Sequence, residues 1–204
     1  MKRLVLFAVF GLAGCASKPS VEWVTSTSMD KFTDQAECLV TVGSYYADTG
    51  VYTLTGHLYP FIKEVNGQLW VGIKSGGKYP VPVGAVQLRV DKNDAWTIEK
   101  DETPTDGLPD TLNFKSYIDL DAYPEEQRKM IQASYKQSSE MTKRMMAPYT
   151  VTTGVKAKAI LSEMLQGKTL IYRSINPLQP SDNVGEYQLD SSLKKSLEMC
   201  NIRY

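Results

Sequence analysis

The chain has 204 residues, of which 42% are hydrophobic and 23% are charged, and its 23 basic and 23 acidic residues give a formal net charge of zero. A chain of this length suits one domain with one core. The even charge balance argues against nucleic-acid binding, and no run of five like charges offers a polybasic membrane patch.

The first 14 residues have the pattern of a signal peptide. Lys2 and Arg3 form a positive start, and the apolar run over 4–12 is shorter than the about 20 residues that span a membrane. The run ends in Leu12-Ala13-Gly14-Cys15, which resembles the bacterial lipobox. This resemblance implies cleavage before Cys15 and lipid on its thiol and new amino group. An ordinary secretory signal that contains a cysteine is the alternative.

The expected location of the protein in the cell follows from the same resemblance. A fully processed lipoprotein carries several acyl chains, which is enough for stable attachment to a membrane. Ala16 and Ser17 follow Cys15, so no aspartate stands where enteric-type bacteria read an inner-membrane retention signal. The resemblance therefore implies a lipid anchor in the bacterial outer membrane, on either its periplasmic face or the cell surface.

Cys38 and Cys200 are the only thiols left once Cys15 carries lipid. Exported proteins meet oxidising conditions, and two cysteines permit a single pairing. We therefore expect a Cys38–Cys200 disulfide. Its role would be structural, since neither cysteine belongs to a Cys-x-x-Cys redox motif. Two unpaired buried thiols are the alternative.

The first half of the chain has the composition of strands and turns. Residues 15–29 are expected to form a lipidated tether because 17–29 are rich in Ser, Thr and Lys, although Trp23 can already dock on the domain. Apolar, β-branched and aromatic residues then predict strands over 38–46, 51–58, 61–65, 69–73 and 83–90. Asn66-Gly67 between two of these runs predicts a hairpin. The polar, Pro-rich residues 99–113 predict an exposed loop.

The second half of the chain is mainly helical in pattern. Helices are predicted over 125–146, 155–165 and 193–199, with a strand over 169–175. The methionines and tyrosine of the first helix form a broken apolar stripe, which predicts partial exposure. Its methionines suit packing in a core or against a partner better than they suit Cu(I) binding.

These elements predict an α+β fold. An antiparallel β-sheet or sandwich-like layer in the first half is followed by helices in the second half and closed by a C-terminal helix. Residues 30–204 are expected to form a single globular domain.

Several segments resemble periplasmic accessory proteins of type VI secretion, of the VasI and TagO kind. The segments are the stretch from Trp23 to Asp30, the strand Val86 to Asp91, and a closing order of Ala159-Ile160-Leu161, Gly167-Lys168-Thr169-Leu170, Tyr187-Gln188-Leu189-Asp190 and a short helix before Cys200. Residues 99–148 have no counterpart in that group. The resemblance implies a similar fold, and no secretion role is taken from it.

No catalytic motif stands out in the sequence. His57 is the single histidine, so a His-rich zinc site is excluded, and no Gly-x-Ser-x-Gly turn accompanies it. Other pairs fit a structural role better than a chemical one: Asp119 with Asp121, Glu125 with Glu126, Gly76 with Gly77, and Arg89 with Asp91. We therefore expect no catalytic residue, no metal and no cofactor.

Twelve tyrosines suit a surface that binds protein or glycan, although core packing explains most of them equally well. The sequence favours a lipid-anchored, non-catalytic envelope protein that binds another envelope or surface protein as an accessory or scaffold. A ligand-binding lipoprotein is the alternative. An enzyme acting on cell wall or glycan would need convergent carboxylates in a cleft, for which the sequence has no motif.

Overall fold

The strands form two antiparallel sheets in the computed structural model, which describes residues 21–29, 36–42, 57–76, 79–105, 108, 120–175 and 184–204. The first sheet has the order β1 (Trp23–Met29), β2 (Ala36–Val42), β3 (Leu58–Val65), β4 (Gln68–Ser75) and β7 (Tyr149–Thr152). The second has the order β6 (Trp96–Ile98), β5 (Val86–Val90), β8 (Thr169–Ser174) and β9 (Val184–Gln188).

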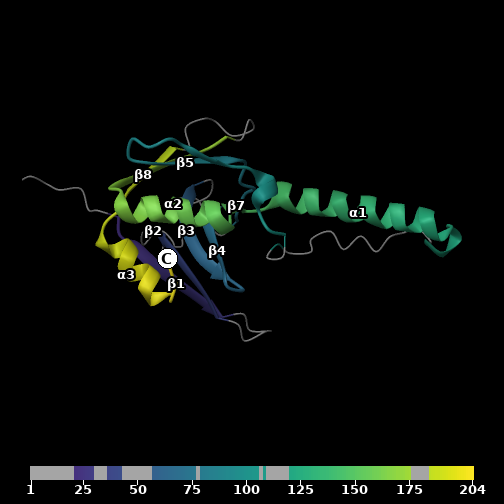
Figure 1. Ribbon diagram of the computed structural model, residues 1–204, viewed down its shortest axis with the longest axis horizontal. Coiled ribbons are helices and arrows are strands. Elements are labelled where there is room, and N and C mark those ends of the chain that lie inside the picture. Colours follow the sequence, from purple (N-terminus) through teal and green to yellow (C-terminus); the bar gives the residue numbers. More distant parts are fainter. Residues whose placement is uncertain are drawn as a thin grey trace, which may run out of the picture.

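Three α-helices and two short 3-10 helices accompany these sheets within the described part of the chain. They are η2 (Lys100–Glu102), η3 (Leu120–Ala122), α1 (Glu125–Met146), α2 (Gly154–Gln166) and α3 (Ser191–Met199). Figure 1 shows α2 running beside the sheets, α3 near β1, and α1 extending far from the rest of the protein. The predicted α+β class, with strands mostly first and a closing C-terminal helix, is confirmed.

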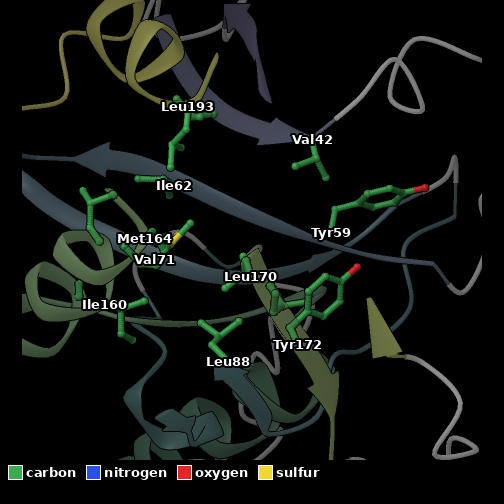
Figure 2. Close-up of a cluster of buried hydrophobic side chains, with 14 of the residues drawn as sticks. Val42, Tyr59, Ile62, Val71, Leu88, Ile160, Met164, Leu170, Tyr172 and Leu193 are labelled. Carbon is green, nitrogen blue, oxygen red and sulfur yellow. The ribbon is translucent and has the colours of Figure 1, made fainter. Parts of the chain in front are cut away.

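One core joins both sheets and two helices. Strand alternation turns one face of each sheet inward, and α2 and α3 add their apolar faces to it. Figure 2 shows side chains from both sheets and both helices converging, among them Ile62, Val71, Leu88, Ile160, Met164, Leu170 and Leu193. The core therefore fixes α2 and α3 firmly on the sheets.

Two polar links hold the sheets and α2 together around this core. The Tyr172 hydroxyl donates a hydrogen bond to the Leu58 carbonyl, which joins β8 to the start of β3. On the other side, the Glu163 carboxylate of α2 accepts hydrogen bonds from Asn93 (3.0 Å) and from the Trp96 indole (3.1 Å). Since α2 also packs on β4, it bridges the two sheets.

The predicted Asn66-Gly67 hairpin is confirmed. Both residues have positive φ, 51° and 75°, which matches the right-handed twist of β3 and β4. The two-residue turn sets Val65 opposite Gln68 and, further along, Lys63 opposite Trp70.

The tether prediction is wrong for residues 23–29, which form β1. This strand pairs antiparallel with β2 over its full length. The docking of Trp23 is confirmed, because its ring is buried and its indole N–H donates to the Gln188 carbonyl at 2.8 Å. The ring and this hydrogen bond hold a strand that has few other apolar side chains.

The exposed-loop prediction is wrong for part of 99–113. Residues 100–102 form η2, and Thr103 is buried against β7, where its hydroxyl accepts the Val151 backbone N–H at 3.2 Å. Leu108 is also buried. The polar composition misled the prediction because these polar groups are satisfied by β7 rather than by water.

The C-terminal helix ends in a tightly defined turn. The Ile202 N–H bonds the Leu197 carbonyl and the Asn201 N–H bonds the Glu198 carbonyl, while Asn201 has φ 55°. This is the Schellman arrangement, which satisfies the last carbonyls of a helix. Because Ile202 is buried in the core, the turn also fixes the residues that follow α3.

Candidate functional site

The long helix α1 is attached to the protein at its C-terminal end. Ala147, the residue after it, is buried, and its carbonyl accepts the Val83 N–H at 2.9 Å. The Arg144 guanidinium donates to the Thr103 carbonyl at 3.2 Å. From this attachment the 22-residue helix extends about 33 Å, away from both sheets (Figure 1).

None of the 22 residues of α1, all of them described, is buried. Packing of an apolar face normally provides most of the stability of a helix in a protein. Here the support is local: Glu125 and Glu126 lie in the first turn, Lys143 and Arg144 in the last, and Lys129 pairs with Glu125 at 2.8 Å. The helix therefore forms without covering its own apolar side chains.

Those apolar side chains share one half of α1. At 3.6 residues per turn, its six large apolar residues fall within about 160° of the circumference, and every charged residue except Arg128 falls in the other half. We call this half the α1 apolar half; its residues are Met130, Ile131, Tyr135, Met141, Met145 and Met146. Met130 is 63% exposed and Met141 is 62% exposed. Such an uncovered surface is typical of a protein-binding site.

The predicted disulfide is present. Cys38 of β2 and Cys200, which follows α3, are bonded with their Cα atoms 5.5 Å apart. Both are half-buried, and Cys200 packs against the core. The bond is therefore part of the fold, whereas Cys15 lies outside the described residues.

The other residues singled out from the sequence take structural positions. His57 is exposed, and its carbonyl accepts the Gly76 N–H. A side chain at Gly76 would collide with the Tyr59 ring, which explains the glycine; Gly77 lies outside the described residues. These residues extend the pairing of β3 and β4 by one position beyond Leu58 and Ser75.

Arg89 and Asp91 do not form the surface charge pair considered from the sequence. Asp91 has φ 50°, and its carboxylate accepts the backbone N–H groups of Lys168 and Thr169 at 3.1 and 2.9 Å. It closes the turn between α2 and β8. Of the acidic pairs, Asp119 lies outside the described residues, and Asp121 binds Arg128 at 3.4 Å beside the start of α1.

A second cluster of unusual side chains lies on the outer face of the first sheet, and the sequence analysis missed it. The Lys63 ammonium pairs with Glu37 and lies 4.8 Å from the Trp70 ring centre and 5.8 Å from that of Tyr149. Trp70 is 2% exposed, and neither its indole N–H nor the Tyr149 hydroxyl has a hydrogen-bond partner among the described residues. Part of this cluster could have been found from the sequence, because the register of the predicted hairpin sets Lys63 opposite Trp70.

Burial perturbs the titratable groups of this cluster. Desolvation lowers the pKa of Lys74, and Lys63 lowers it further while Glu37 opposes the change. Desolvation, helped by Glu37, raises the pKa of Tyr149 to about 12. The Lys74 ammonium and the Tyr149 ring both lie against the ring of Phe61. The aromatic and apolar side chains of this cluster pack as a small second core, separate from the main one.

A third polar group links α2 to η2. The Glu102 carboxylate accepts hydrogen bonds from Lys156 at 2.6 Å, from Thr152 at 2.7 Å and from the Glu99 N–H at 3.0 Å. Burial acts to raise the pKa of Glu102, but these hydrogen bonds outweigh it, so the pKa lies below its ordinary value. The carboxylate is thus an ionised structural anchor.

Within the described ranges, no helix is both long and apolar enough to cross a membrane. The same residues include no group of three or more His, Cys, Asp or Glu side chains that could hold a metal ion. Comparison of the chain with protein-family models, curated proteins and solved structures finds no match. The resemblance to type VI accessory proteins therefore stays a prediction.

Proposed function

We propose that this protein is a lipid-anchored, non-catalytic component of the bacterial outer membrane that binds another envelope protein through the α1 apolar half. The anchor rests on the Leu12-Ala13-Gly14-Cys15 sequence. The binding role rests on one observation: a 22-residue helix with no buried residue carries its large apolar side chains on one half, in which Arg128 is the single charged residue.

A protein partner fits this surface better than a lipid bilayer does. The α1 apolar half contains four methionines, one isoleucine and one tyrosine, with serine and threonine between them, and it has no Trp, Phe or Leu. Helices that lie in the membrane interface rely on those larger residues. Methionine side chains are flexible and adapt to the shape of a partner protein. The partner therefore has a complementary apolar surface.

The structural use of several titratable side chains supports a non-catalytic role. Glu102 is held by three hydrogen bonds, and Lys63 is paired with Glu37. Asp91 caps backbone N–H groups. Each of these side chains already has a structural partner.

Capture of the partner by two triple variants tests the proposal. Met130→Gln/Met141→Gln/Met145→Gln makes the α1 apolar half polar without lowering helix propensity much. The matched control, Lys129→Gln/Lys136→Gln/Lys143→Gln, changes the charged half with the same new residue. After crosslinking in intact cells, the methionine variant should recover at least about tenfold less partner than wild type, and the lysine variant should recover as much.

The salt dependence of the same interaction is a second test. Because every charged residue of α1 except Arg128 lies on its other half, recovery of the partner should change little between low and high salt. Equal losses in both triple variants, or loss only in the lysine variant, would show that α1 does not bind through its apolar half.

A further inference from the structure

A hollow of about 330 Å³ opens on the surface where α2, the start of β4 and the end of the chain meet. Leu69, Leu161 and Leu165 form its apolar part, and Lys158, Arg203 and Tyr204 also line it. A second hollow of about 270 Å³ adjoins it at Leu165 and reaches Met164, Leu189 and Leu193. We call the two together the α2–α3 groove. Its first hollow falls at the lower end of the roughly 300–1,000 Å³ range of small-molecule sites.

The walls of the groove are fixed. Leu161 and Met164 are core residues of α2, and Leu193 is a core residue of α3. The buried side chain of Ile202 and its hydrogen bond to Leu197 hold the turn that precedes Arg203. In Figure 1 the C-terminal end lies between α2 and α3. A ligand would therefore meet a preformed surface, which lowers the entropic cost of binding.

The charges along the groove are unbalanced. Lys158 and Arg203 line the first hollow with no acidic side chain, and Lys194 lines the second. Among the described residues, neither Lys158 nor Arg203 makes a side-chain hydrogen bond or ion pair. Asp190 is the one acid of the second hollow, and its carboxylate already caps α3 through the Ser192 N–H at 2.9 Å. Three cationic side chains thus line the groove, against one acidic side chain and the α-carboxyl group of Tyr204.

We propose that the α2–α3 groove binds a single-chain amphiphile with an anionic head, of the fatty-acid class. Lys158 and Arg203 hold the head, since an Arg guanidinium and a Lys ammonium both form charge-assisted hydrogen bonds with a carboxylate or a phosphate. The aliphatic tail lies over Leu69, Leu161 and Leu165, because contact with these side chains removes its apolar surface from water. This site is separate from α1, so it stands or falls independently of the partner proposed above.

Calorimetric titration of the full 204-residue Cys15→Ser chain tests this site, because that chain has no lipid on Cys15 to compete for the groove. Dodecanoate should bind saturably at one site, dodecanol should bind at least about tenfold more weakly because it lacks the charge, and acetate should not bind. The anionic head could belong to a free fatty acid or to a lipid phosphate, and dodecyl phosphate distinguishes the two. Binding comparable to that of dodecanoate indicates lipid phosphates, and weaker binding indicates free fatty acids. Equal affinity for dodecanoate and dodecanol, or no saturable binding, would overturn the proposal.

Substitutions in the groove test whether dodecanoate binds there. Lys158→Gln/Arg203→Gln should weaken dodecanoate binding at least about tenfold and leave dodecanol binding unchanged. The control Lys168→Gln/Lys195→Gln removes two exposed lysines that do not line the groove and should bind dodecanoate like the parent chain. Ser162→Trp, at an exposed position of α2 that lines the first hollow, should obstruct it and weaken binding of both amphiphiles. Equal affinities in the paired variant and its control would place the binding elsewhere.

Discussion

Cys38 of β2 and Cys200 after α3 form a disulfide between positions separated by 162 in the sequence. The bond links the second strand of the first sheet to the helix that packs on β1 and β2. It thereby closes nearly the whole described fold into one covalent loop.

Replacing either cysteine should therefore destabilise the protein. Closing so long a loop lowers the conformational entropy of the unfolded chain. Loss of such a bond therefore lowers the free energy of unfolding by about 2 to 5 kcal/mol. Chemical denaturation of Cys38→Ala, Cys200→Ala and the double variant should give similar losses for all three, since each removes the same bond. If both thiols react with an alkylating agent in protein taken from the envelope without reductant, the bond does not form in the cell.

Gly72 of β4 should tolerate no side chain. A Cβ there would lie 2.1 Å from the Thr150 carbonyl oxygen and 2.7 Å from the Val151 Cα, both backbone atoms of β7. Gly72→Ala should cost about 3 kcal/mol or more because neither strand can move aside. Gly154→Ala is the control: it has open space but φ 63°, so only about 1 to 2 kcal/mol of backbone strain is expected. Thermal denaturation that ranks Gly154→Ala as the more harmful would contradict the close β4–β7 approach.

Glu102 should make the protein sensitive to acid. Its folded-state pKa lies below the ordinary value of 4.5, so its stabilising effect is complete above pH 4.5 and is lost as pH falls through the folded-state pKa. Between pH 5 and 3, wild type should lose more unfolding free energy than Glu102→Gln, whose side chain does not titrate. Parallel pH profiles for the two proteins would mean that the hydrogen bonds from Lys156 and Thr152 do not favour the charged form.

Cys15 should be the site of lipid attachment. A clickable palmitate analogue fed to growing cells should label the wild-type chain and a Cys38→Ser variant, which keeps the lipobox. The Cys15→Ser variant should carry no label and should remain uncut or become soluble. Label that persists on Cys15→Ser would rule out the lipoprotein assignment.

Elements governed by local pattern could be predicted from the sequence. The bounds of α1 match the run without Pro or Gly between Pro124 and Pro148. Asn66-Gly67 marks the turn of the β3–β4 hairpin, because both residues accept positive φ. The disulfide followed from compartment and cysteine count. Each of these inferences needed only neighbouring residues or a count.

Elements governed by distant partners could not be predicted. The strand β1 is mostly polar after Trp23. It is held by pairing with β2 and by the hydrogen bond from Trp23 to Gln188, 165 positions away. The four-residue strand β7 forms by pairing with β4, which lies far earlier in the chain. The α2–α3 groove brings together Leu69, Lys158 and Arg203, which no local spacing relates.

The central claim is that the α1 apolar half binds a partner protein, and site-specific photocrosslinking in intact cells tests it most directly. A photoreactive phenylalanine analogue replaces Met141 in one variant and Lys136, on the charged half of the same helix, in another. Our account predicts a discrete crosslinked species of defined mass from position 141 and little or none from position 136. Crosslinks of equal yield from both positions, or from position 136 alone, would contradict it.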